Sequence, residues 1–497
     1  MSPIPASVLA PTVVLTLAAI AMAGPPTGPL KVLPSNPRYF TDGSGKAIYL
    51  AGSHTWNNLQ EIERPAPARP NPVLDFGEFL SFLEARKHNC FRLWPWENAA
   101  SFNAKGEVIY RQDPMPFTRS GPGEALDGRP KFDLTRFNQP YFDRLRLRVT
   151  AARDRGMYVI VMLFQGFSIV RKDDSHGDPW KGHPFHAANN VNGLDGDPKH
   201  EGNGLQTTCL TVPAVTAVQE AYVRKVIETI NDLDNVLYEI TNEDTGSPPN
   251  TQWQYHMIRF IRKCEAEKPK QHPVGMTVQY PNGRNEPLFE SPADWISPNA
   301  DGGYQTDPPA ADGRKVILND TDHSFYYTAL QKATQDGQRA WVWKNFTRGN
   351  HVLFMDPYLD PTPWNHTARN RPKDGKPDPY WEMLRVSMGY ARLYADRMDL
   401  AAMTPQPALA SSGFCLACRS PKETELLIYL PAGPRVTVDL TGLEGNLAVE
   451  WFNPSGGAVQ GSGDCGRGPA GPDRAVCRGR GALHGPAARG DREVTAR

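Results

Sequence analysis

Short apolar runs alternate with helix-like patterns along most of the chain. Eight runs are predicted as strands, and several are rich in Val, Ile and Leu throughout, which is typical of strands buried on both faces of a sheet. They are Ile48–Gly52, Cys90–Trp94, Tyr158–Phe164, Val236–Thr241, Pro273–Val278, Trp295–Ser297, Lys315–Asn319 and His351–Met355. Alternation of strands and helices predicts βα units and a parallel sheet.

Helical periodicity fills several of the intervals between these strands. The predicted helices are Phe76–His88, Gln139–Arg155, a segment in which Val218, Tyr222, Val226 and Ile230 share one face, and Tyr380–Met398. The fifth and sixth units are poorly marked. Eight βα units within a few hundred residues match the size of a (β/α)8 barrel. We therefore expect an α/β fold, a TIM barrel over residues 30–402.

The pattern changes near residue 404. Beyond a Pro-rich linker, Glu425–Leu430, Arg435–Leu440 and Leu447–Phe452 are short strand-like runs separated by Gly and Pro. They predict a small antiparallel, sandwich-like β-domain over residues 408–460. Residues 461–497 are rich in Gly, Arg, Ala and Pro and poor in apolar residues. Such a stretch cannot bury a core and is expected to be disordered, either as a genuine tail or as out-of-frame translation.

The amino-terminal segment is typical of an export signal. An apolar run from Val13 to Ile20 precedes Ala21-Met22-Ala23, a small-x-small cleavage pattern. Residues 1–23 are therefore expected to be a signal peptide, and the mature protein to be secreted or periplasmic. The run is short for a bilayer, and no later segment is long enough to span one.

Composition narrows the function classes. Lys+Arg and Asp+Glu number 54 each, so no net charge favours nucleic acid or an anionic membrane. Seven cysteines form no ligand framework, and the histidines between residues 176 and 200 match no metal-ligand spacing. We expect no metal and no cofactor. The sequence does not indicate an oligomeric state.

The chemistry of a (β/α)8 enzyme lies at the carboxyl ends of its strands. The polar and aromatic residues at those predicted ends are His54, Trp56, Arg92, Trp94, Trp96, Glu97, Gln165, Asn242, Glu243, Gln279, Tyr280, Asp320, Asp322, His323 and Asp356. Carboxylates and aromatic rings dominate. Two facing carboxyl groups between aromatic walls are what cleavage of a glycosidic bond requires, one as acid and one as nucleophile or base.

The barrel resembles the large clan of retaining glycoside hydrolases that includes cellulases and apiosidase-like enzymes. The resemblance rests on Asn242-Glu243 at the end of the fourth strand and on Arg92 in the second. It implies that Glu243 is the acid/base, that Asn242 contacts the sugar and that Arg92 supports the nucleophile. At strand seven the clan usually carries Glu, whereas this chain has Asp320, in register, and Asp322 two positions later.

Asp320 is the favoured nucleophile and Asp322 its rival. Because Asp is one methylene shorter than Glu, an inverting mechanism with a wider carboxyl separation stays an alternative. The remaining substrate-binding candidates are His54, Trp56, Trp96, Glu97, Gln165, Tyr280 and His323. Trp96 is the preferred one for stacking on a sugar ring.

The segments from Glu425 to Pro454 resemble a collagen-binding-type β-domain that follows such barrels in bacterial secreted proteins. A role in packing against the barrel is an equal interpretation. The sequence is therefore compatible with two functions. One is a secreted glycosidase acting on a poly- or oligosaccharide. The other is a non-catalytic carbohydrate-binding or matrix-adhesion protein on a barrel scaffold.

Overall fold

A computed structural model describes residues 26–64, 73–171, 177–323, 334–359, 376–419, 424–432, 435–441, 446–464, 474–478 and 482–488. The expected signal peptide, residues 1–23, lies outside this part of the chain. No helix within it is both long and apolar enough to cross a membrane.

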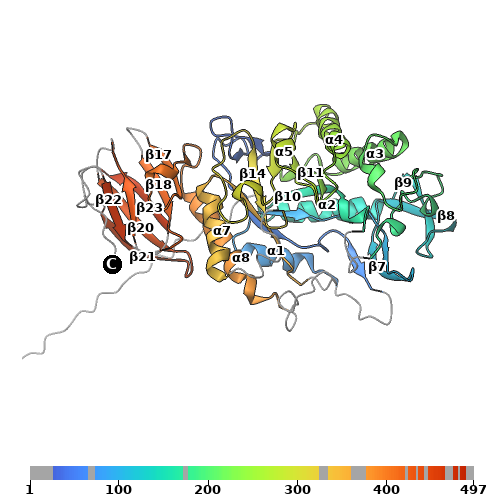
Figure 1. Cartoon of the computed structure of the whole chain (residues 1–497), viewed down its shortest axis with the longest axis horizontal. Coiled ribbons are helices and arrows are strands. Elements are labelled where there is room, and N and C mark those ends of the chain that lie inside the picture. Colours follow the sequence, from blue (N-terminus) through green and yellow to red (C-terminus); the bar gives the residue numbers. More distant parts are fainter. Residues whose placement is uncertain are drawn as a thin grey trace, which may run out of the picture.

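Eight parallel strands close into a barrel (Figure 1). In chain order they are β3 (Ala51–His54), β5 (Cys90–Leu93), β10 (Tyr158–Gln165), β11 (Val236–Asn242), β12 (Val274–Thr277), β13 (Trp295–Ser297), β14 (Val316–Asp320) and β15 (His351–Met355). Each overlaps one of the eight predicted runs, and β15 pairs with β3 to close the ring. The prediction of a TIM barrel with a small β-domain is confirmed.

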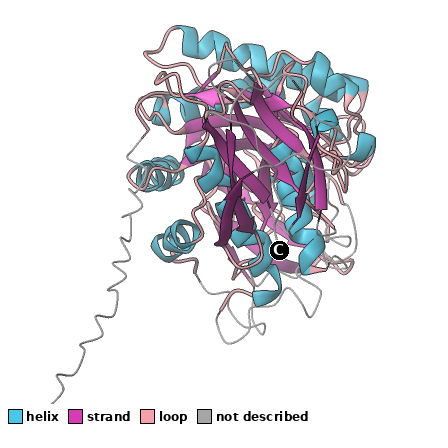
Figure 2. Ribbon diagram, turned by 90° about the vertical axis from the view of Figure 1, so that its left-hand side faces the viewer, coloured by secondary structure: helices cyan, strands magenta, loops and turns pink. Residues whose placement is uncertain are grey.

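Helices cover the outside of the barrel (Figure 2). They are α1 (Phe76–Ala85), α2 (Gln139–Arg153), α3 (Pro213–Ile230), α4 (Pro248–Ala266), α5 (Glu286–Glu290), α7 (Gln335–Thr347) and α8 (Glu382–Arg397). In α3 the predicted stripe of Tyr222, Val226 and Ile230 is buried, as helical periodicity requires. By contrast, the connection from β13 to β14 holds only the short turn η5 (Asp301–Gly303).

Two insertions lie at the barrel mouth, and the strands of the first were not predicted from the sequence. A sheet of β4 (Glu61–Glu63), β7 (Val108–Asp113) and β6 (Ala100–Phe102) and a hairpin of β8 (Phe117–Glu124) and β9 (Pro130–Phe137) adjoin β5. The loop after β10 contains η1 (Gly166–Ser168), η2 (Trp180–Gly182), η3 (Ala187–Asn189) and η4 (Leu205–Thr208). Bridges from Phe102 to Asp178 and from Phe132 to Asn190 join the two insertions. They extend away from the carboxyl-terminal domain (Figure 1).

Near the amino terminus, β1 (Lys31–Val32) pairs with β2 (Phe40–Thr41). The carboxyl-terminal domain has a six-stranded sheet and a separate pair of strands. The sheet contains β16 (Thr404–Pro405), β17 (Cys415–Arg419), β18 (Thr424–Tyr429), β23 (Ala482–Ala488), β20 (Asn446–Asn453) and β21 (Ala458–Asp464), and the pair is β19 (Arg435–Asp439) with β22 (Arg474–Arg478). Turn η6 (Pro379–Trp381) precedes α8, and turn η7 (Pro407–Leu409) lies between β16 and β17.

This arrangement differs from the expected disorder of residues 461–497, because parts of β21 and all of β22 and β23 fall there. The physical reason is pairing through the backbone. Strand β23 lies between β18 and β20, and β22 pairs with β19. Neighbouring apolar strands thus supply hydrogen bonds that do not depend on the side chains of the added strand.

The carboxyl-terminal domain shares a hydrophobic core with the barrel. Trp343 of α7 packs on Phe452 of β20 and on Tyr429 of β18, with ring centroids 5.7 and 6.2 Å apart. Arg397 of α8 forms an ion pair of 3.0 Å with Glu450, which also accepts a hydrogen bond from the hydroxyl of Tyr394. The two domains are therefore packed together along α7 and α8.

Inside the barrel, side chains follow the period of two that strands impose. Cys90, Leu237 and Leu318 belong to one apolar cluster. Two residues further along the same strands stand Arg92, Glu239 and Asp320, all with side chains fully buried. A charged layer therefore lies above an apolar layer, towards the carboxyl ends of the strands.

Candidate active site

The charged layer is an ion-paired triad. The Nε of Arg92 lies 2.7 Å from Oε2 of Glu239, and its Nη1 lies 2.8 Å from Oδ2 of Asp320. Burial raises the pKa of Glu239 to about 7 although Arg92 favours its ionised form. Burial also raises the pKa of Asp320. Both pKa values rise because burial removes the carboxyl groups from water, and this disfavours their charged form.

Sequence reasoning missed Glu239. Its signal was available: Glu239 is a charged residue inside the apolar run from Val236 to Ile240 and lies on the same strand face as Leu237. A charge there is expensive unless it is paired. Its partner is Arg92 of β5, and both β5 and β11 pair with β10.

Glu243 directly follows β11 in a left-handed backbone conformation, with φ of +48°. Such a conformation costs a residue other than glycine about 1–3 kcal/mol and persists only where its surroundings enforce it. Gly166 is one enforcing element, since a Cβ there would lie 2.1 Å from the carbonyl oxygen of Glu243. Gln279 is another, because its Oε1 accepts a hydrogen bond of 2.5 Å from the N–H of Asp244.

Asp322 lies beyond the end of β14, and its N–H donates to Oδ1 of Asp320 over 3.0 Å. Burial raises the pKa of Asp322 well above its usual range, and the neighbouring charge of Glu243 raises it further, ahead of that of Asp320. Arg92 acts in the opposite direction. The carboxyl groups of Glu243 and Asp322 are therefore electrostatic neighbours at the barrel mouth.

His323 connects two strand ends. Its Nδ1 lies 2.9 Å from Oγ of Ser297, and its Nε2 lies 2.8 Å from Oδ1 of Asn242. Burial and Arg92 lower the pKa of His323 well below its usual range, so the ring is neutral. The amide oxygen of Asn242 can only accept, so Nε2 carries the proton and Nδ1 accepts from Ser297. The Nδ2 of Asn242 finds no hydrogen-bond partner among the described residues.

The predicted aromatic residues divide into two kinds. Trp56, Trp94 and Trp96 pack with one another in a buried cluster, and the indole N–H of Trp96 donates to the carbonyl of Trp56 over 2.8 Å. Trp96, preferred for stacking, is only 5% exposed. Tyr280 is 41% exposed and thus presents an accessible ring at the end of β12.

His54, Gln165 and Glu97 stand on the strand ends where they were expected. His54 is fully buried and stacks on Trp94 with ring centroids 5.4 Å apart, and neither of its ring nitrogens has a hydrogen-bond partner within the described ranges. Oε2 of Glu97 accepts from the N–H of Gln165 over 2.6 Å. Glu97 thereby ties the end of β5 to the end of β10.

No group of three or more His, Cys, Asp and Glu suited to a metal ion occurs in the described part of the chain. The loop histidines instead support local turns. Nδ1 of His183 accepts from the N–H of Phe185, and Nδ1 of His186 accepts from the N–H of Ala188.

One sequence family and several solved structures are similar to this chain. A sequence profile of the family described as "Domain of unknown function (DUF6298)" matches residues 105–280. No curated protein matches the sequence. A solved structure described as a glycoside hydrolase is similar at 13% identity with a TM-score of 0.53, covering 93% of this chain and 97% of its own. A glycoside hydrolase family 5 structure from Bacteroides vulgatus is similar at 13% identity with a TM-score of 0.57, covering 93% of both chains. At this identity the similarity is one of fold.

Proposed function

We propose that this chain is a glycoside hydrolase that cleaves O-glycosidic bonds of a poly- or oligosaccharide with the carboxyl groups of Glu243 and Asp322. The observation that carries the proposal is that Glu243 and Asp322 follow the carboxyl ends of β11 and β14, where the charge of Glu243 raises the pKa of Asp322. Paired carboxyl groups with opposite tasks are the machinery of glycoside hydrolysis. The similarity in fold to solved glycoside hydrolases supports this reading.

The choice of Asp322 over Asp320 follows from their contacts. Both oxygens of Asp320 are engaged, Oδ2 by Arg92 and Oδ1 by the N–H of Asp322, and its side chain is fully buried. The side chain of Asp322 is 9% exposed, and its Oδ2 lies 3.8 Å from Nε2 of His323 without a hydrogen bond to any described residue. In this proposal Asp320 positions Asp322 and holds Arg92, and Asp322 is the nucleophile.

The reaction would run as a double displacement. Glu243 donates its proton to the glycosidic oxygen while the Asp322 carboxylate attacks the anomeric carbon, so the bond to the leaving alcohol breaks and a glycosyl ester forms. The Glu243 carboxylate then takes a proton from water. That water attacks the anomeric carbon and releases Asp322. Arg92 opposes the rise in the pKa of Asp322 that burial and the charge of Glu243 cause, and so favours the carboxylate that the attack requires.

Asn242 is suited to bind the sugar beside this pair. His323 holds its amide oxygen, so Nδ2 is left to donate to a substrate hydroxyl. The buried nitrogens of His54 and the exposed ring of Tyr280 offer further polar and apolar contacts.

We also propose that the protein is exported and that its carboxyl-terminal domain packs against the barrel. The apolar segment before Gly24 supports export of the protein. The shared core around Trp343 and Phe452 supports a packing role for the carboxyl-terminal domain rather than an independent binding module.

Azide rescue tests the assignment, because azide can replace a missing carboxylate. A panel of aryl glycosides first identifies a hydrolysed substrate for the wild type. With azide, Asp322→Ala should then form a glycosyl azide of inverted anomeric configuration, and Glu243→Ala one of retained configuration. The matched variant Asp320→Ala should form neither.

Three outcomes would contradict the proposal. Rescue of Asp320→Ala in place of Asp322→Ala would reassign the nucleophile. NMR of the anomeric proton reports the configuration of the product that the wild type releases. An inverted product would indicate a single displacement instead of a double displacement. Glycan binding without turnover of any substrate would favour the non-catalytic alternative.

A further inference from the structure

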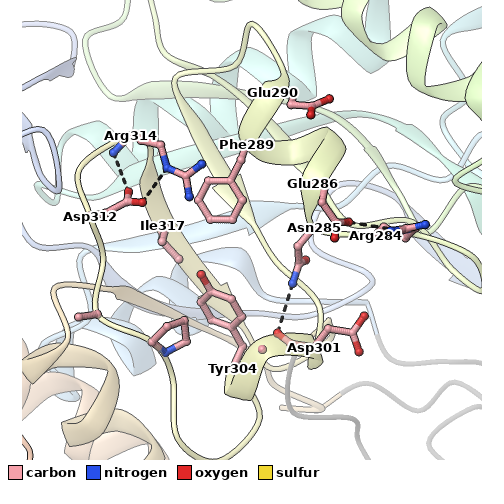
Figure 3. Close-up of a pocket in the computed structure, with 13 residues that line it drawn as sticks. Arg284, Asn285, Glu286, Phe289, Glu290, Asp301, Tyr304, Asp312, Arg314 and Ile317 are labelled. Atoms are coloured by element: carbon pink, nitrogen blue, oxygen red, sulfur yellow. Dashed lines mark hydrogen bonds and ion pairs between the residues drawn. The ribbon is translucent and has the colours of Figure 1, made fainter.

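A cavity of about 640 Å³ lies on the flank of the barrel, beside α5 and the connection from β13 to β14 (Figure 3). Its volume is in the range of small-molecule sites. Ile317 of β14 lines it. The neighbours of Ile317 in the strand, Val316 and Leu318, belong to the apolar cluster inside the barrel, so Ile317 points outward. The cavity is thus separate from the mouth that holds Glu243.

The cavity exists because the helical layer is thin at this place. Helix α5 has only five residues, and residues 298–315 contain one short turn. The outward face of a parallel barrel strand must nevertheless be covered. Phe289 of α5 and Tyr304 after η5 provide that cover, and they leave the space between them open (Figure 3).

Tyr304 directs a polar atom into this space. The residue is 4% exposed, and Figure 3 shows its hydroxyl pointing between Phe289 and Ile317. No hydrogen bond joins this hydroxyl to any other residue drawn there. Burial and Asp312 raise the pKa of Tyr304 to about 12, so the hydroxyl keeps its proton. The hydroxyl therefore faces the open cavity as a donor and acceptor for a ligand that enters it.

The charges of the lining exclude two ligand classes. Arg314 is paired with Asp312 at 2.6 Å and Arg284 with Glu286 at 3.3 Å. Because the lining has more carboxylates than guanidinium groups, its charge disfavours an anion. Glu290 and Asp301 form no ion pair within the described residues and stand at opposite ends of the cavity (Figure 3). A compact cation needs converging acceptors, and these two carboxylates do not converge.

We propose that this cavity is a second binding site for a neutral oligosaccharide. A sugar ring combines an apolar face, for Phe289 and Ile317, with hydroxyl groups that donate to Glu290 and Asp301 and accept from Tyr304. The aromatic ring of Phe289 is itself held by the guanidinium of Arg314, 4.5 Å from its centroid. The choice of a glycan as ligand rests on the proposed function, whereas the cavity and its lining do not.

The test measures binding without turnover. The full chain carrying Glu243→Gln is applied to an array of neutral gluco-, manno-, galacto- and xylo-oligosaccharides, with and without Tyr304→Phe and Glu290→Gln. We expect the double cavity variant to lose about ten- to a hundredfold in affinity for one set of glycans. Binding of that set of glycans should be unchanged by Asn242→Ala, which removes a contact at the mouth. Tyr255→Phe, whose hydroxyl donates to Pro287 outside the cavity lining, should change nothing, and unaltered melting temperatures would show that each variant folds.

Arrays that are identical with and without the cavity variants would overturn the inference. So would displacement of the bound glycan by putrescine, an aliphatic diamine, because the cavity would then be a cation site. The array measures binding alone. A wild type that hydrolyses no glycan would therefore refute the proposed function, and the effect of the cavity variants on binding could still be measured.

Discussion

The ring of His323 donates from Nε2 to Oδ1 of Asn242 over 2.8 Å while its Nδ1 accepts from Ser297 at 2.9 Å. The amide of Asn242 is therefore fixed in one of its two orientations, with Nδ2 free to donate. A residue that carries no role in the resemblance to known hydrolases thus determines what Asn242 offers a substrate.

Replacing His323 should weaken catalysis through Asn242. In His323→Ala the Asn242 oxygen loses its donor, so the amide can rotate. One lost hydrogen bond of about 1–3 kcal/mol predicts a loss of about ten- to a hundredfold in kcat/KM. Steady-state kinetics should show this effect, and Ser297→Ala should show a smaller loss of the same kind. His256→Ala, on a partly exposed helix face, is the matched control and should retain wild-type kinetics.

Glu243→Gln should reduce kcat by about a hundred- to ten-thousandfold, because a general acid contributes a factor of this size. The loss should be smallest for aryl glycosides with acidic leaving groups, which need no protonation. Rates for a series of such substrates measure this dependence. An equal loss for all leaving groups would contradict the role of Glu243 as the acid.

Gly166→Ala should impair the site without touching a substrate. Its Cβ would meet the carbonyl oxygen of Glu243 at 2.1 Å, so the strained turn at Glu243 must shift. Small displacements of a catalytic group cost about a hundredfold in rate, and kcat should fall accordingly. Gly77→Ala, in helix α1 where a Cβ meets only a side-chain oxygen at 3.3 Å, should leave kcat unchanged. Full activity of Gly166→Ala would show that the turn tolerates the shift.

Arg92→Met should destabilise the fold. It leaves Glu239 and Asp320 buried without their partner, and breaking a buried ion pair from one side costs about 3–5 kcal/mol. Chemical denaturation should show this loss in the free energy of unfolding. Arg146→Met breaks an exposed pair with Asp232 and should cost less than about 1 kcal/mol. Equal effects of the two variants would argue against the burial of the triad.

Glu239 should make stability depend on pH. Its pKa is about 7 in the folded chain against a usual value of 4.5, so the folded state binds the proton more tightly. This contribution to stability is complete below about pH 4.5 and is lost as the pH rises to about 7. Glu239→Gln cannot titrate and should lose less stability over that range than the wild type. Parallel denaturation series at several pH values measure the difference, and identical pH profiles would contradict it.

The sequence by itself determined the barrel and part of its site. Periodicity and apolar runs are local properties, so they located all eight barrel strands and placed Arg92 and Glu243 at strand ends. The run Lys315–Asn319, which is followed by Asp320 and Asp322, likewise indicated an aspartate at the end of the seventh strand.

Only the tertiary structure decided which of these groups meet. How Asp320 and Asp322 lie relative to Glu243 depends on the stagger of the closed strands and on the backbone after each strand, and both arise from contacts between residues far apart in sequence. The pairing of Glu239 with Arg92 and the orientation of Asn242 by His323 have the same origin. The flank cavity does as well, because it forms where the helical layer is thin and the distant residues Phe289, Tyr304 and Ile317 enclose the space.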